Sequence, residues 1–225
     1  MVEKSKTYKY ILTVEGETEK WYFDWLSEKI KACDTISDTV SIKATVQQSP
    51  MKFAKRINNL TTPTIFHICD VESKEPVHVE KFKNILKEMK KAKTDKGISY
   101  ILGYSNFTFE LWMILHKQAC NGHLTNRTQY LSHINRAFNE EFEDLNKYKA
   151  HDAFHRCLSK LSLEDVKGAI DRSETITKMN KEDGVKVNSN YGFKYYDENP
   201  SLSIWEVVKK IFLDCGYVKE VEEEA

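Results

Sequence analysis

The sequence predicts an α/β fold in which a four-stranded parallel sheet is flanked by helices and followed by a helical C-terminal part. In the first half of the chain, short apolar runs rich in β-forming residues alternate with segments of helical periodicity. Beyond residue 118 the patterns are mainly helical. We therefore predict an α/β domain over residues 1–118 and a mainly helical region over residues 119–225 packed on it.

The predicted strands are four segments with period-two or continuous apolar patterns. They cover residues 10–14, 39–47, 64–69 and 98–102. Helices are expected between them, because the intervening apolar residues recur at helical spacing and Pro76 is suited to open a helix. Strands that alternate with helices predict parallel pairing with right-handed crossovers.

The first strand leads into a sharp turn at Glu15 and Gly16. Glycine permits such a turn, and Thr18 is suited to cap the helix that follows. Because parallel sheets bind ligands just outside the carboxyl ends of their strands, Glu15 lies where a functional residue is expected.

The C-terminal part begins with residues 107–119, which are apolar nearly all round and predict a buried helix. Glu110 and Lys117 are expected to share its narrow polar side. Residues 181–199 form a polar segment with several aromatic residues, which predicts a long loop. Its aromatic side chains could stack on unpaired bases, or they could pin the loop to the core or to a second subunit.

Composition excludes several classes of protein. The 225 residues are 40% hydrophobic and 30% charged, and no run of about 18 apolar residues predicts a membrane span. The N-terminal residues lack an apolar signal segment, and the five cysteines are scattered, so we expect a cytoplasmic protein with reduced thiols. The formal net charge of zero argues against strong non-specific binding of nucleic acid by this chain alone.

Lysines are concentrated between residues 81 and 96. This segment is interpreted either as a solvated helix face or as a patch that contacts phosphates.

Carboxylates follow two of the predicted strands. Glu15 follows the first, and Asp70 and Glu72 follow the strand at residues 64–69. If these strands are neighbours, about 4.8 Å apart, and the backbone stays extended, the three carboxylates converge and need a cation to offset their repulsion. Oxygen ligands of this kind suit Mg²⁺ or Mn²⁺. The alternative is that these acids only cap the helices that follow them.

Several of these segments carry a resemblance to a known family. The sequence EGETE after the first strand, with an acid-x-acid step at residues 70–72, resembles the Toprim catalytic domain of topoisomerases, primases and OLD-type nucleases. Across nearly the whole chain the sequence resembles the RloB family of Toprim-related proteins. The matching segments are ILTVEGETEKWYF, SNFTFELWMILHK and NPSLSIWEVV.

The resemblance implies a set of site residues. Glu15 would be a general base or metal ligand with Glu19 nearby, Asp70 and Glu72 would be metal ligands, and Glu110 and His116 would lie beside them. The usual Toprim step is Asp-x-Asp, whereas this chain has Asp70-Val71-Glu72, in which glutamate keeps the charge and adds a methylene.

The resemblance also implies a function. The expected activity is Mg²⁺- or Mn²⁺-dependent cleavage of DNA or RNA in bacterial anti-phage defence of the abortive-infection kind. The alternative is a non-catalytic regulatory or effector subunit that docks on a partner ATPase of the AAA or ABC type. A primase-like activity would use the same acids, and assembly into a homo-oligomer is left open.

Overall fold

The computed structural model describes residues 6–57 and 63–219. Its centre is a five-stranded sheet with the order β2-β1-β3-β4-β7, in which the first four strands are parallel and β7 is antiparallel to β4. The strands of this sheet are β1 (Thr7–Val14), β2 (Thr39–Val46), β3 (Thr64–Asp70), β4 (Ser99–Asn106) and β7 (Ser201–Leu202). The four predicted strands are confirmed. The fifth was not predicted, because a two-residue strand leaves no periodic pattern.

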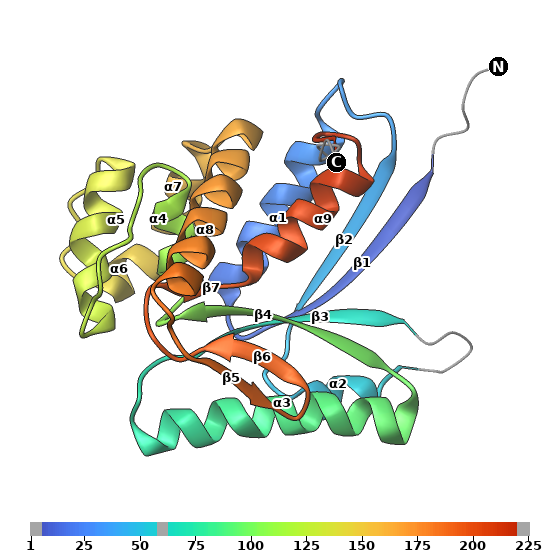
Figure 1. Ribbon diagram of the computed structural model, residues 1–225. Coiled ribbons are helices and arrows are strands. Elements are labelled where there is room, and N and C mark those ends of the chain that lie inside the picture. Colours follow the sequence, from blue (N-terminus) through green and yellow to red (C-terminus); the bar gives the residue numbers. More distant parts are fainter. Residues whose placement is uncertain (1–5, 58–62, 220–225) are drawn as a thin grey trace.

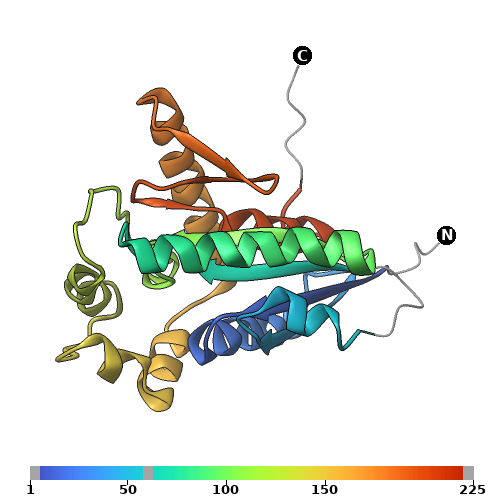
Figure 2. The ribbon, with the colours of Figure 1, turned by 90° about the horizontal axis from the view of Figure 1, so that it is seen from below.

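Helices cover both faces of the sheet (Figures 1 and 2). One face carries α1 (Glu17–Lys31) and α9 (Ile204–Asp214), and the other carries α2 (Pro50–Ala54) and α3 (Pro76–Lys96). Side chains alternate between the two layers. Leu12 and Ile68 belong to the core under α1 and α9, whereas Ile65 and Cys69 belong to the core over α3. This burial on both faces explains the continuous apolar runs in the strands.

The remaining helices lie beyond the carboxyl ends of the parallel strands (Figure 1). They are α4 (Glu110–Leu115), the 3₁₀ helix η1 (Arg127–Gln129), α5 (Tyr130–Phe138), α6 (Leu145–Lys149), α7 (His151–Ser159) and α8 (Leu163–Glu182). One buried cluster contains side chains of β1, α4 and α8, so the core continues across residue 118, where the sequence predicted a boundary. None of the helices in the described residues is long and apolar enough to cross a membrane.

Two predicted elements differ from the structure. The buried helix expected over residues 107–119 is only six residues long, because His116 and Lys117 bond back three residues and tighten its last turn. The long loop expected at residues 181–199 contains a hairpin of β5 (Val187–Asn190) and β6 (Phe193–Tyr196). Its two turn residues, Tyr191 and Gly192, both have positive φ, as a tight hairpin turn requires.

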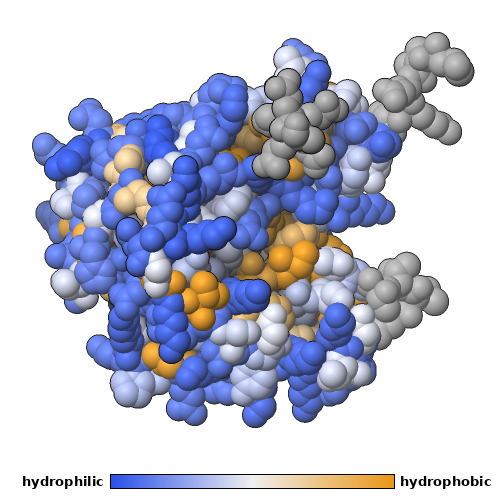
Figure 3. Space-filling model, in the orientation of Figure 1, coloured by the Kyte–Doolittle hydropathy of each residue, from blue (hydrophilic) through white to orange (hydrophobic). Residues whose placement is uncertain are grey.

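The hairpin lies against α3 (Figure 2), and Tyr195 is buried between Phe82 and Tyr104. Packing on the core, one of the interpretations of the aromatic residues in this segment, therefore holds for Tyr195. Figure 3 shows that the face viewed in Figure 1 is mostly hydrophilic, with apolar residues in a recess between the two helical layers on the right and in smaller patches elsewhere.

Candidate metal and phosphate site

Glu15 and Asp70 meet where two neighbouring strands end. β1 pairs in parallel with β3, and the Glu15 carboxylate accepts a hydrogen bond of 2.9 Å from the backbone N–H of Asp70. The strand pairing meets the condition under which the sequence analysis expected these two acids to converge. The carboxyl edge of the sheet therefore holds both acids in one place.

Glu19 joins them from the first turn of α1. Gly16 is the N-cap of this helix, and a Cβ atom at Gly16 would lie 3.0 Å from Oε2 of Glu19. Glycine thus lets the Glu19 carboxylate fold back against the turn. Thr18 does not cap the helix as predicted, because it lies inside the helix, where its hydroxyl donates to Glu19 at 3.1 Å.

Glu110 completes a group of four carboxylates, which we call the acidic cluster: Glu15, Glu19, Asp70 and Glu110. Glu19 and Glu110 are buried, at 6% and 2% exposure. Burial raises the pKa of Asp70 well above its ordinary value, and the charges of the other three carboxylates raise it further. Burial also raises the pKa of Glu19, with Glu110 adding to the effect. Mutual repulsion of this kind is relieved by positive charge nearby, which makes the acidic cluster a candidate functional site.

Two lysines bring positive charge to this site. Lys149, the last residue of α6, places its Nζ 2.9 Å from Oε1 of Glu110. Burial opposes the charge on Lys149, but nearby carboxylates outweigh it, so the pKa of Lys149 lies above its ordinary value. Lys81 of α3 contacts Glu15 at 3.3 Å and Glu72 at 2.6 Å. Sequence reasoning missed Lys149, because nothing in its local pattern indicates a partner 39 residues away.

Glu72 lies apart from the acidic cluster. β3 ends at Asp70, and Glu72 adopts a positive φ of 63°, so the alternation expected for extended backbone does not apply to these two acids. Besides Lys81, Glu72 contacts His78 at 3.1 Å. Burial raises the pKa of Glu72, but Lys81 and His78 outweigh that effect and leave it below its ordinary value. Lys81 is thus the link between Glu72 and Glu15.

His116 lies in the hydrophobic core. It is 1% exposed, with Nε2 3.1 Å from the Tyr22 hydroxyl and Nδ1 2.9 Å from the Trp112 carbonyl oxygen. Burial lowers its pKa to about 4. Both ring nitrogens are occupied, so the structure does not bring His116 together with the acidic cluster.

Lys117 also differs from its predicted position. It bonds Asp165 at 2.9 Å and leaves Glu110 to Lys149. The cause is the early end of α4, which takes Lys117 off the helix that starts at Glu110.

The acidic cluster offers only oxygen donors, which suit Mg²⁺ or Mn²⁺. Oε2 of Glu110 is buried without a hydrogen-bond partner, and so is Oε1 of Glu15, which lies 3.3 Å from Lys81. Within residues 6–57 and 63–219, however, no three His, Cys, Asp or Glu side chains are arranged to hold a metal ion as they stand. The donors are therefore of the type that binds a hard cation. In the present arrangement of the side chains, however, Lys81 and Lys149 offset their negative charge.

A groove opens beside Glu72. This cavity of about 530 Å³ is lined by Lys74, His78 and Arg127 among others. Arg127 lies at the start of η1, and its charge also lowers the pKa of Glu72. Cationic side chains beside a carboxylate edge are suited to hold a phosphate near the acids.

These features define an α/β protein with a mostly parallel sheet and buried carboxylates at its carboxyl edge. The sequence model of the RloB-like protein family matches residues 10–211. The chain therefore belongs to the RloB-like family. No curated protein matches the chain. No solved structure matches it either.

Proposed function

We propose that this protein is a metal-dependent phosphodiesterase that cleaves nucleic acid in the cytoplasm of bacteria as part of anti-phage defence. The observation that supports it most is the convergence of Glu15, Glu19, Asp70 and Glu110 at the carboxyl edge of the sheet, where Asp70 has a raised pKa. Ordinary stability does not require four carboxylates in a partly buried site, since their repulsion is unfavourable. A Toprim-like arrangement of the parallel strands is part of this proposal.

In this proposal Asp70 and Glu15 would hold the cation, with Glu110 beside them. When bound, Mg²⁺ or Mn²⁺ supplies Lewis-acid stabilisation of a phosphate oxygen and a water of lowered pKa. Lys81 contacts Glu15 and Glu72, so a cation on Glu15 would compete with Lys81 for that carboxylate. A Lys81 side chain released from Glu15 would be free to contact a phosphate of the substrate.

Proton transfer is assigned to Glu19. Burial raises its pKa, so its carboxyl group keeps a proton at a higher pH than an exposed glutamate does. Lys149 holds Glu110 in place by their 2.9 Å contact, and Arg127 and Lys74 offer positive charge along the groove. DNA and RNA both present the phosphates that such a groove would hold.

The direct test is incubation of the protein with plasmid DNA, single-stranded DNA and total tRNA, each with Mg²⁺, Mn²⁺ or EDTA. We expect cleavage of at least one substrate with metal and none with EDTA. Glu15→Gln and Asp70→Asn should remove cleavage and protection against phage together. Equal products from wild type and Asp70→Asn would refute the proposal.

A second candidate function is a non-catalytic regulatory subunit that docks on an AAA- or ABC-type ATPase. The ion pairs of Lys81 and Lys149 favour it, because they offset the acidic charge without a metal. In that case the protein should co-purify with the ATPase and change its rate of ATP hydrolysis. Asp70→Asn should leave both effects and phage protection intact, whereas the nuclease proposal predicts loss of protection.

A further inference from the structure

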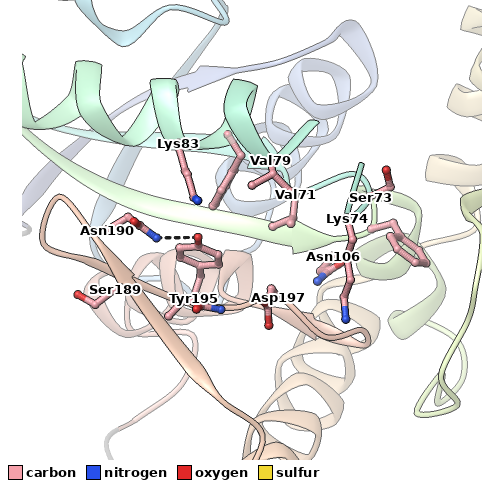
Figure 4. Close-up of a pocket in the computed structure, with 13 residues that line it drawn as sticks. Val71, Ser73, Lys74, Val79, Lys83, Asn106, Ser189, Asn190, Tyr195 and Asp197 are labelled. Carbon is pink, nitrogen blue, oxygen red and sulfur yellow. Dashed lines mark hydrogen bonds between the residues drawn. The ribbon is translucent and has the colours of Figure 1, made fainter. Parts of the chain in front are cut away.

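A second cavity lies between α3, the β5–β6 hairpin and the end of β4 (Figure 4). Its volume is about 450 Å³, which is within the usual range for small-molecule sites. We call it the hairpin pocket. Its lining includes aromatic, amide and lysine side chains: Phe82, Lys83, Asn106, Phe107, Asn188 and Tyr195.

The aromatic wall of the hairpin pocket is fixed in place. The ring of Tyr195 packs edge-on against Phe82, with centroids 4.9 Å apart, and lies 6.3 Å from Tyr104. Its hydroxyl accepts a hydrogen bond of 2.8 Å from the Asn190 amide, as Figure 4 shows. These fixed rings give the pocket a rigid apolar wall, which suits contact with a planar ring because little conformational entropy is lost on binding.

Two residues of the pocket lining carry buried amide donors without partners. Asn106 is 1% exposed, and its Nδ2 has no hydrogen-bond partner among the described residues. Figure 4 shows this residue among those that line the cavity. The Nδ2 atom of Asn188 is likewise buried and unpaired within the described part of the chain. Buried amide donors favour a ligand that brings acceptor atoms, such as the ring nitrogens and carbonyl oxygens of a nucleobase.

The charge in this region is suited to a phosphate. Lys83 lines the pocket and makes no ion pair with any residue of 6–57 or 63–219. Lys74, also in the lining, pairs with Glu198 at 2.7 Å. Asp197 contributes the opposing charge. Aromatic side chains together with lysines are typical of sites for single-stranded nucleic acid.

The hairpin pocket adjoins the groove beside Glu72. Ser73, Lys74 and Phe107 line both cavities. The groove contains His78 and Arg127 and ends at Glu72, whose partner Lys81 also contacts Glu15 of the acidic cluster. A strand whose backbone lies in the groove can therefore turn one base into the hairpin pocket without leaving the candidate site.

We propose that the hairpin pocket receives an unpaired nucleobase of a single-stranded nucleic acid whose backbone lies in the groove beside Glu72. This inference rests on the proposed function for its substrate, and it adds a preference for unpaired strands. A base inside a duplex is stacked and paired, so it is not free to enter the pocket.

The test measures binding in EDTA, where cleavage plays no part. The probes are fluorescent 12-nucleotide single strands of DNA and RNA, a strand of the same length made of abasic residues, and a blunt duplex. We expect the abasic strand and the duplex to bind wild type at least about five-fold more weakly than the better base-bearing strand, because the loss of one stacked base has about this effect or more.

Two variants locate the effect. Asn106→Leu should weaken binding of the base-bearing strand about five-fold and leave binding of the abasic strand unchanged, since it removes one donor to the base. Lys83→Met should weaken binding as well, whereas Lys87→Met, one helical turn further along α3 and outside the pocket lining, should change it less than two-fold. If Asn106→Leu does not fold, the comparison of Lys83→Met with Lys87→Met and the binding of the abasic strand still test the proposal.

Equal binding of base-bearing and abasic strands by wild type would overturn the inference, and so would the absence of binding to any single strand. Base-dependent binding that Lys83→Met weakens, in a protein that cleaves nothing, would support the pocket and refute the nuclease proposal. Metal-dependent cleavage by a protein whose binding does not depend on bases would support the nuclease proposal and refute the base-binding pocket.

Discussion

The Nζ of Lys149 lies 2.9 Å from Oε1 of Glu110, and this contact joins the end of α6 to the start of α4. Glu110 is 2% exposed, whereas the Lys149 side chain is 39% exposed. The pair therefore links a buried acid beside the strand ends to a residue that solvent and ligands can reach.

Lys149→Met should destabilise the protein, because Glu110 loses the cation that offsets its buried charge. We expect a loss of about 1–2 kcal/mol in the free energy of unfolding, less than for a fully buried pair since Lys149 is partly exposed. Chemical denaturation measures this loss. Lys117→Met is the matched control, because Lys117 bonds Asp165 and should contribute under about 1 kcal/mol. A larger loss from Lys117→Met would contradict the assignment of Lys149 as the partner.

Glu110→Gln distinguishes a packing role of Glu110 from a role in the cleavage reaction. The two side chains have nearly the same volume, so a packing role predicts unchanged cleavage and a small change in stability. If Glu110 acts at the site, the variant should fold well and cleave at least about ten-fold more slowly, as is typical for a positioned acid or base. Cleavage rate and melting temperature should be measured on the same preparation. A wild-type rate would remove Glu110 from the site.

Asp70→Asn should stabilise the metal-free protein at high pH. The folded-state pKa of Asp70 is raised, so its protonated form adds stability that is present below the unfolded-state pKa and is lost as the pH rises through the folded-state pKa. Asparagine does not titrate, so the variant does not lose stability in this way as the pH rises. The melting temperature of the variant should therefore exceed that of wild type at pH 8, and the difference should shrink towards pH 4.

The same variant tests metal binding. Millimolar Mg²⁺ or Mn²⁺ should raise the melting temperature of wild type at pH 8, because a ligand bound only to the folded state stabilises it. Asp70→Asn should show little or no rise. Identical curves for wild type with and without both metals would count against a cation site in the acidic cluster.

The sequence predicted the parallel strands from two patterns: a continuous apolar run where the strand is buried on both faces, as in β3, and period-two alternation in the edge strand β2. It also indicated that Glu15 and Asp70 would meet if their two strands were neighbours, since the carboxyl ends of parallel strands lie at one edge of the sheet. The strand order that meets this condition came from the structure. The hairpin at Val187–Tyr196 was missed, although Asn190, Tyr191 and Gly192 supply a turn signal. Tyrosine at a position of positive φ is uncommon, so the signal was weak.

The positions of the site side chains were less predictable. Glu72 was expected beside Asp70, but the chain turns away at residue 72, and no residue-type preference for glutamate indicates a positive φ there. Lys149 approaches Glu110 through the packing of α6 near α4, which is a tertiary contact without a local pattern. The contacts that long side chains make between distant elements could therefore be known only from the structure.

His116 should behave as a core residue, so His116→Gln should change stability more than cleavage. Its folded-state pKa is about 4, below the ordinary 6.5, because burial disfavours the charged ring. The neutral ring therefore adds stability that is present above pH 6.5 and is lost as the pH falls towards 4. Glutamine should lower the free energy of unfolding at pH 8 by about 1–3 kcal/mol, and the difference from wild type should shrink between pH 6.5 and pH 4. Cleavage at pH 8 should stay within about two-fold of wild type, since both ring nitrogens bond core groups and neither bonds a cluster carboxylate. A well-folded His116→Gln protein with at least ten-fold slower cleavage would instead mean that Tyr22 and Trp112 transmit its influence to the acids.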